Sequence, residues 1–233
     1  MGIIHYAYSF DRQLTGLDLA ECFDLQKKLT ISVYDTQIDR TVCNGFGMQF
    51  LEDLCFDRED WKSETTGYRD RMEKLIKVCV AKHISGVHKV SQSSFALIEA
   101  LLPTFNWNVD KIKLLLMGRQ FYHLVESFGL PDPDSPQGHL VKSPSWLPFD
   151  EVRNLSTDFK SEMKQFMHPT ASSLKIAKAV KAHMFLDEQS DTDLMQRAFT
   201  EMTSRLQLGE QTGHDLLLIN EAATYQNRVL DPI

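Results

Sequence analysis

The stretch WLPFDEVRNLSTDFKSEMKQFM, residues 146–167, decides most about the fold of this chain. Its apolar residues recur every three or four positions, a spacing that places side chains on one face of a helix. They are Phe149, Val152, Leu155, Phe159, Met163, Phe166 and Met167. The charged residues of the stretch fall mostly on the opposite side. The pattern therefore predicts one long helix with a single buried face.

Two apolar runs at the ends of the chain predict strands. GIIHYAY at residues 2–8 is rich in β-branched and aromatic residues, and GHDLLLIN at residues 213–220 is short and bounded by Gly and Asn. The first run is apolar on both faces, which indicates a covered, central strand. The simplest arrangement pairs the two runs. We therefore expect a predominantly helical α+β fold, with a small sheet that joins the N-terminal and C-terminal strands.

Periodic segments between these strands predict further helices. Suitable helix starts are Ser91, Asn108 or Asp110, and Ser190 or Asp191. Pro103 is a suitable terminator, and Gly129 closes an almost entirely apolar helix. The expected helices cover residues 17–29, 47–56, 66–83, 93–102, 109–128, 173–187 and 193–209, and residues 30–34 read as a short strand.

The domain organisation is expected to be a single α+β domain over residues 1–233. Residues 130–148 hold five of the eight prolines and form the longest irregular stretch. Because each proline fixes φ, this stretch is stiff. It is the only candidate internal boundary, and its apolar residues favour a segment that lies across the body of the fold.

Composition excludes some classes of function. The chain of 233 residues is 42% hydrophobic and carries a formal net charge of -7. An acidic balance disfavours a nucleic-acid partner, because neutralising phosphates needs clustered Lys and Arg. The N-terminus does not resemble a signal peptide, and no apolar run approaches the ~20 residues that span a bilayer. We expect a cytoplasmic protein with no membrane partner, and the sequence leaves its oligomeric state open.

The sequence contains no recognisable catalytic or cofactor motif. It lacks a Walker loop and the patterns G-x-G-x-x-G, H-E-x-x-H and G-x-S-x-G. We therefore expect no cofactor. The four cysteines lie in the first third with no C-x-x-C pair, which favours reduced and mostly buried thiols.

One partial metal-binding pattern can be drawn from the sequence. Cys79 and His83 are four residues apart, which places them on one face of the expected helix, and His88 follows soon after. The alternative is that Cys79 belongs to the core while the histidines stabilise a helix C-terminus. We expect no metal site on balance.

A second pattern suggests acid–base chemistry. Arg119, His123 and Glu126 would line one face of the expected helix over residues 109–128, and an imidazole beside a carboxylate can exchange protons near neutral pH. The alternative is an ordinary polar edge on an amphipathic helix. His214 and Asp215 open the last expected strand and could form a site at the end of the sheet, although a turn is the simpler interpretation.

A third pattern suggests a binding loop. Asp57 and Asp60 lie in a charged stretch beside Trp61, and an exposed aromatic residue in an acidic loop can anchor a protein partner. The alternative is a solvated loop whose Trp61 side chain folds back onto the core.

Both ends of the chain carry short motifs of a known kind. MGIIHYAY opens the chain, WLPFDEV stands at residues 146–152, and GHDLLLI at residues 213–219 forms a Gly-charged turn and a final strand. In these features the chain resembles the YfbM-like family of uncharacterised bacterial proteins, while its middle, about 45–130, is longer than in a typical member. The resemblance implies an α+β fold and supplies no catalytic residue, because the activity of that family is not established.

Two functions remain in view. The first is a non-enzymatic protein-binding module, of an immunity or regulatory type, which would attract basic partners through its negative charge. The alternative is a small enzyme of unknown reaction, with its site at the end of the sheet or near His123 and Glu126.

Overall fold

A computed structural model describes residues 3–20, 79–80, 82–120, 123–124, 127, 145–184 and 190–222 of the chain. Contacts divide the chain into two compact units. The first unit comprises residues 1–10, 84–124 and 138–228, and the second comprises residues 11–83, 125–137 and 229–233. One boundary between them falls inside the proline-rich stretch. The single-domain organisation stays a prediction.

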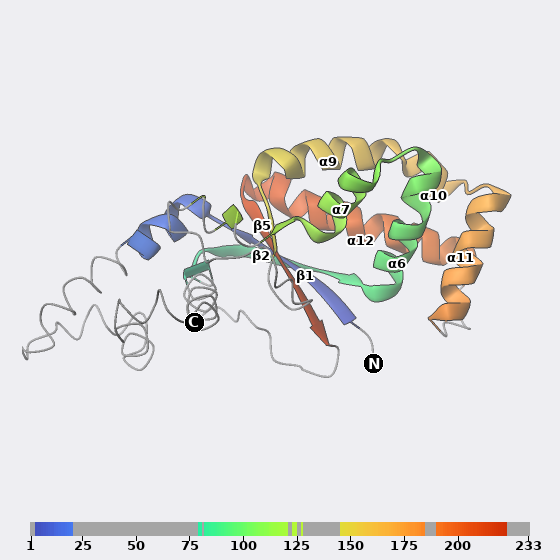
Figure 1. The fold of residues 1–233 in the computed structure, drawn as a ribbon, viewed down its shortest axis with the longest axis horizontal. Helices are drawn as coiled ribbons and strands as arrows, with labels where there is room; N and C mark the ends of the chain where they lie inside the picture. The colour runs from blue at the N-terminus through green and yellow to red at the C-terminus, as the bar shows by residue number, and fades with distance from the viewer. Residues whose placement is uncertain are drawn as a thin grey trace, which may run out of the picture. The chain divides into compact units, whose positions relative to one another are not determined.

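The sheet of the first unit has five described strands in the order β2-β1-β5-β4-β3, with every pairing antiparallel (Figure 1). The terminal strands β1 and β5 pair directly, with Ala7 opposite Leu218. The strands are β1 (Ile3–Phe10), β2 (Ile84–Ser91), β3 (Arg119–Gln120), β4 (Ser145–Leu147) and β5 (Asp215–Ala222). The expected pairing of the two chain ends is confirmed.

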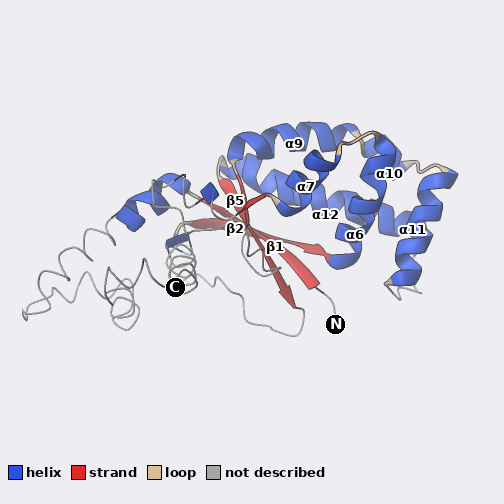
Figure 2. Ribbon diagram, viewed as in Figure 1, coloured by secondary structure: helices blue, strands red, loops and turns tan. Residues whose placement is uncertain are grey.

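The described helices of the first unit gather on one side of this sheet (Figure 2). They are α6 (Gln92–Leu101), α7 (Val109–Met117), α9 (Phe149–Ser161), α10 (Met163–Met167), α11 (Ala171–His183) and α12 (Asp191–Thr212), with a short 3-10 helix, η1 (Leu102–Phe105). The described part of the chain is thus a predominantly helical α+β fold, as expected.

Side chains of β1 and β5 alternate between the two faces of the sheet. Ala7, Leu216 and Leu218 belong to the core that the helices share. Tyr8 and Leu217 are the neighbours in sequence that point the other way, and they are buried as well. Both faces of these strands are therefore covered, which agrees with the apolar character that the sequence shows on both faces of β1.

Aromatic rings fill the centre of the helical layer. Phe159 of α9 lies 5.3 Å from Phe199 and 5.6 Å from Phe166 between ring centroids, and 6.2 Å from Trp107. Phe159 and Phe166 are fully buried. The apolar stripe predicted over residues 149–167 therefore supplies the middle of the core. The prediction is wrong for Met163, which is 54% exposed.

The prediction of one helix over residues 146–167 is wrong at its start and at residue 162, whereas the expected end at Met167 is correct. Trp146 and Leu147 form strand β4 and pair with β5. Pro148 follows as the N-cap of α9, a position where its missing N–H is not needed. The helix is interrupted at Glu162, between α9 and α10. The Glu162 carboxylate accepts a hydrogen bond from the indole of Trp107 at 3.1 Å.

The prediction of one helix over residues 109–128 is also wrong, because α7 ends at Met117. Gly118 has φ 65° and ψ −167°, a conformation open essentially to glycine alone. A Cβ there would lie 2.9 Å from the carbonyl oxygen of Trp146. Glycine is therefore required for the turn that leads into β3.

Strand β2 was not expected from the sequence, which placed a helix over residues 66–83 and no element between that helix and Ser91. Its β-branched residues Ile84, Val87 and Val90 are three positions apart, and that spacing imitates a helix. Pairing along β1 overrides this local signal.

Three predicted N-caps are confirmed in the first unit. The side chain of Ser91 accepts from the amide of Ser94, Asn108 from Lys111, and Ser190 from Asp193. The last helix, α12, extends beyond the expected Gly209 to Thr212 and ends at Gly213 in the left-handed conformation.

In the second unit, residues 12–20 are helical. Asp11 caps this helix, because one of its carboxylate oxygens accepts from the amides of Gln13 and Leu14 at 2.9 and 3.0 Å. The helix thus begins before the expected residue 17. The strand expected at 30–34, the helix expected at 47–56 and most of the helix expected at 66–83 lie outside the described residues.

Candidate functional site

The residues proposed for acid–base chemistry do not share a helix face. Arg119 lies on β3, where its guanidinium pairs with Glu151 of α9, with Nε 2.9 Å from the carboxylate oxygen. His123 lies beyond the strand in a helical position, and Glu126 lies outside the described residues. The expected alignment of Arg119 with His123 along one helix is wrong, because Gly118 ends α7 before either residue.

Arg119 and His123 nevertheless line the same hollow of about 240 Å³. Its other lining residues are Asp110, Lys113, Leu114, Gly118 and Gln120. Pockets that bind small molecules usually measure about 300–1,000 Å³. This hollow is smaller and open, so it suits a single side chain of a partner better than a sequestered substrate.

The pattern Cys79, His83 and His88 does not form a ligand set. Cys79 is buried in the core, and His83 lies 3.0 Å from a carboxylate oxygen of Asp18. His88 lies on β2 and not at a helix end. Within the described ranges, no group of three or more His, Cys, Asp or Glu side chains is placed to hold a metal ion.

His88 of β2 is half-buried and lies close to the charged side chains of Glu201 and Arg205 of α12. Burial lowers the pKa of His88, and the charge of Arg205 adds to this shift, while a backbone hydrogen bond and the charge of Glu201 oppose it. Its Nε2 atom is buried and has no hydrogen-bond partner among the described residues. The folded state therefore favours neutral His88.

Arg205 of α12 is fully buried beside His88. Both of its terminal nitrogens donate to the carbonyl oxygen of Leu116 at 3.3 Å. Burial lowers the pKa of Arg205 to about 10, so the side chain stays charged at neutral pH. A buried charge of this kind raises the cost of adding a second positive charge at His88.

The stability of the chain is expected to fall as the pH drops below about 6.5, the ordinary pKa of histidine. Because the pKa of His88 is lower in the folded state, the unfolded chain binds more protons in the window beneath that value, and acid favours unfolding there. The substitution His88→Gln should reduce the dependence of the free energy of unfolding on pH in this acidic window. A single titrating proton can change that free energy by at most about 1.4 kcal/mol per pH unit. Urea unfolding between pH 5 and pH 8 measures it.

The matched control for His88→Gln is His183→Gln, on the exposed surface of α11. This control should leave the acid-side slope as it is in the wild type. An identical slope in wild type and His88→Gln would show that His88 does not carry the effect.

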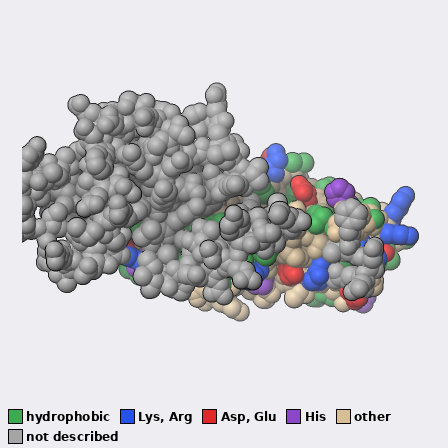
Figure 3. All heavy atoms as spheres, turned by 90° about the horizontal axis from the view of Figure 1, so that it is seen from below, with side chains coloured by type: hydrophobic (Ala, Val, Ile, Leu, Met, Phe, Trp, Pro, Cys, Tyr) green, Lys and Arg blue, Asp and Glu red, His purple; other side chains and the backbone are tan. Residues whose placement is uncertain are grey.

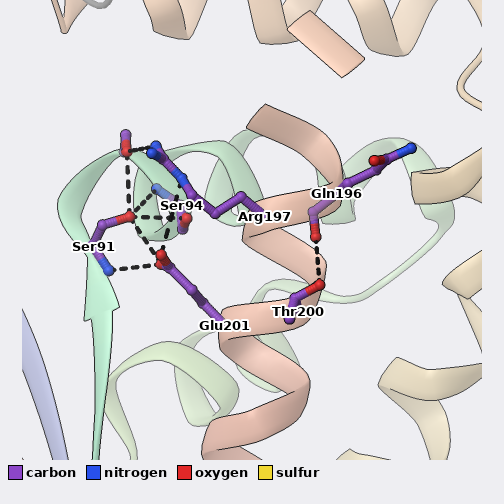
Figure 4. Close-up of polar contacts among 7 residues, drawn as sticks. Ser91, Ser94, Gln196, Arg197, Thr200 and Glu201 are labelled. Atoms are coloured by element: carbon purple, nitrogen blue, oxygen red, sulfur yellow. Dashed lines mark hydrogen bonds and ion pairs between the residues drawn. The ribbon is translucent and has the colours of Figure 1, made fainter. Parts of the chain in front are cut away.

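A polar network joins the end of β2 and the start of α6 to α12 (Figure 4). One Glu201 oxygen accepts from both the amide and the hydroxyl of Ser91 at 2.8 Å. Arg197, one turn earlier on α12, donates to the hydroxyl of Ser93 at 2.7 Å. The carboxylate also lies near the positive N-terminal end of α6. Because these hydrogen bonds tie α12 to the junction of β2 and α6, we assign the network a structural role.

A second chain of polar groups lies at the opposite end of β2. The hydroxyl of Ser85 is 2.9 Å from Nδ1 of His214 and 3.0 Å from the hydroxyl of Ser9. Ser9 is in turn 2.6 Å from the hydroxyl of Thr212, which donates to the backbone carbonyl of Leu208 at 2.8 Å. Ser9 is fully buried, whereas Ser85 is exposed. The pairing of β1 with its neighbours brings these residues together.

Asp215, next to His214, holds the same end of the sheet in place. Its carboxylate accepts from the indole of Trp146 at 2.9 Å and from the backbone amide of Phe149 at 2.8 Å. The second contact satisfies an N–H of the first turn of α9, where Pro148 offers no capping side chain. Asp215 therefore has a structural position, while His214 faces Ser85.

Sequence reasoning identified His214 and Asp215 as a possible site at the end of the sheet but missed Ser85. Ser85 and His214 are 129 positions apart. No local motif marks such a pair, so only the predicted pairing of strands could have indicated it. The proposed binding residues Asp57, Asp60 and Trp61 lie outside the described residues.

Comparison of the chain with protein-family models, with curated proteins and with solved structures gives no match. Among the described helices, none combines the length and apolar character that crossing a membrane requires.

Proposed function

We propose that the protein is a protein-binding module that uses an exposed face of α7 to contact a basic partner. Val109, Lys113 and Met117 follow one another at four-residue spacing on this helix, so they share one side of it. We call these three residues the α7 stripe. Val109 is 62% exposed and Met117 is 47% exposed. Two large apolar side chains in solvent on one helix face are the observation that carries the proposal.

The hollow described above adjoins the α7 stripe, because Lys113 belongs to both. A protein contact of ordinary design has an apolar centre, a polar rim and a pocket that receives an anchoring side chain of the partner. The α7 stripe supplies apolar area, and Asp110, Arg119 and His123 supply polar groups around the hollow. This combination favours a partner side chain over a small substrate.

The proposed binding surface on α7 is held in place by contacts within the first unit. The N-terminal end of α7 is tied to α9, since Lys111 pairs with Asp158 at 2.6 Å and lies 4.2 Å above the ring of Trp107. Arg119 is held by Glu151 of the same helix. A surface built on helices that are fixed in this way costs little ordering entropy on binding.

Charge argues for a basic partner. The net charge of -7 attracts positively charged proteins over distances comparable to the Debye length of about 10 Å at 0.1 M salt. On the coloured part of the surface in Figure 3, acidic, basic and apolar side chains are interspersed. The attraction therefore comes from the overall balance, while the α7 stripe defines where the partner docks.

The test compares two doubly substituted chains with the wild type. Val109→Glu with Met117→Glu places two charges in the α7 stripe, and Leu14→Glu with Leu17→Glu makes the same change at two exposed leucines of the helix at 12–20. A protein captured by the immobilised wild-type chain is purified and titrated against all three chains by calorimetry.

We expect a basic partner with a defined stoichiometry, an affinity at least ten-fold weaker for Val109→Glu/Met117→Glu, and an unchanged affinity for the control pair. Ten-fold corresponds to about 1.4 kcal/mol. Association should also slow as salt rises from 50 to 250 mM. The proposal fails if no stoichiometric partner is recovered, if the partner is acidic, or if the α7 substitutions leave the affinity unchanged.

A further inference from the structure

We propose that Ser85 and His214 form a nucleophile–base pair that accepts an acyl group from a small carboxylic ester. This activity is separate from the protein-binding function and uses another part of the first unit. The inference begins from the distance of 2.9 Å between the Ser85 hydroxyl oxygen and Nδ1 of His214. That distance is within the range at which a histidine can remove the proton of an attacking hydroxyl.

The directions of the hydrogen bonds follow from the end of the hydroxyl chain. The carbonyl groups of Leu208 and Gly209 can only accept, so the single proton of Thr212 is directed to them. The Ser9 hydroxyl, which is 2.6 Å from that of Thr212, must then donate to it. Its lone pairs remain available toward Ser85.

Ser85 therefore has one proton and three nearby acceptors, of which Nδ1 of His214 is closest at 2.9 Å; the hydroxyl of Ser9 is at 3.0 Å and its backbone carbonyl oxygen at 3.3 Å. When neutral His214 carries its proton on Nε2, Nδ1 accepts the Ser85 proton directly. Because the proton of Ser9 is directed to Thr212, Ser9 can only accept from Ser85, so it competes with His214 for the Ser85 proton and makes no hydrogen bond to Ser85 while Ser85 donates to His214.

The position in the fold leaves the pair accessible. Ser85 belongs to β2, the edge strand of the described sheet, and its side chain is exposed. The register between β1 and β2 is interrupted between Ser9 and Phe10, next to Ser85. Irregularities of this kind re-aim side chains at strand ends and often lie beside active sites. A reagent in solvent can thus reach the oxygen of Ser85.

The chemical step balances without a further reactant except water. The oxygen of Ser85 bonds to the carbonyl carbon of the ester while Nδ1 of His214 takes the hydroxyl proton. The carbon–oxygen bond to the alcohol then breaks, and His214 returns the proton to the departing oxygen. Water attacks the acyl-serine with His214 again as the base, which releases the carboxylic acid and restores the Ser85 hydroxyl.

The test is covalent labelling of the full chain with p-nitrophenyl acetate and, separately, with a fluorophosphonate. Intact-mass and peptide mass spectrometry locate the label, and the release of p-nitrophenolate gives the rate. Four chains are compared: wild type, Ser85→Ala, His214→Gln, and Ser172→Ala as a control at an exposed serine of α11. Circular dichroism verifies that each chain is folded.

We expect one label per chain on Ser85, no label on that peptide in Ser85→Ala, a rate at least 100-fold lower in His214→Gln, and an unchanged rate in Ser172→Ala. A general base contributes about 10²–10⁴-fold in rate, which sets this threshold. The proposal is overturned if the folded wild type is not labelled, if the label lies on another residue, or if His214→Gln reacts as fast as the wild type.

Discussion

Replacing Phe159 by Ala is expected to lower the free energy of unfolding by about 3–5 kcal/mol. The ring is fully buried and contacts the aromatic rings of Trp107, Phe166 and Phe199, so its removal leaves a cavity that rigid neighbours cannot fill. Because natural domains are stable by only about 5–15 kcal/mol, this loss is a large fraction of the total free energy of unfolding. Equilibrium urea unfolding of the purified chains measures the loss.

The control for Phe159→Ala is Met163→Ala, whose side chain is 54% exposed one turn further along the chain. This change should alter the free energy of unfolding by less than about 0.5 kcal/mol. Equal effects at the two positions would mean that the stripe at residues 149–166 does not face the core as described.

Replacing Gly118 by Ala is expected to cost about 2–4 kcal/mol, the second large effect. Two penalties combine at this position. A φ of 65° with ψ of −167° is strained for any residue that carries a Cβ, and the added carbon would lie 2.9 Å from a backbone oxygen of β4, which cannot move without disturbing the sheet.

Gly213→Ala separates these two penalties. Gly213 also has a positive φ, 71°, but a Cβ there meets nothing within 4 Å. We expect this variant to lose only about 1 kcal/mol, the cost of a left-handed residue with a side chain. If thermal or urea unfolding shows Gly118→Ala to be no more harmful than Gly213→Ala, the close approach of residue 118 to β4 is wrong.

The features of the fold that the sequence predicts correctly depend on local chemistry or on strong patterning. Ser91, Asn108 and Ser190 act as N-caps because each side-chain oxygen accepts from an amide in its own helix. The two terminal strands were predicted because their runs of apolar residues admit few alternatives. We expected the two strands to pair because each apolar run needs neighbours that shield it from solvent.

The errors arise where distant partners override local periodicity. Trp146 and Leu147 continue an apolar stripe, yet hydrogen bonds to β5 make them a strand. Gly118 interrupts a helical pattern that continues in the sequence up to Gly129. Ile84 and Val87 have helical spacing but pair with β1. In each case a sheet contact with a residue distant in sequence, 28 residues away for Gly118 and Trp146 and more for the others, decides the local structure.

The Ser85–His214 site also arises from contacts between residues that are distant in sequence. Ser85 and His214 carry no motif, and their neighbour Ser9 belongs to a third segment. Sequence reasoning favoured Arg119 and His123 because it placed both on one helix. Helix α7 ends at Met117, before either residue, yet both side chains line the same hollow. Sequence pattern could locate the strand ends but not the side chains that meet there.

The Ser85–His214 pair and the packing of the sheet against the helical core both depend on strand β1 lying between β2 and β5 in the described register. The most direct test is nuclear Overhauser spectroscopy on the isotopically labelled chain. We predict cross-strand contacts that place Ala7 opposite Leu218 and Tyr8 opposite both Leu217 and Val87. A register displaced by one residue, or no contact between residues 3–10 and 215–222, would contradict this account, because it would separate Ser9 and Ser85 from His214 and turn the core residues of β1 and β5 away from the helices.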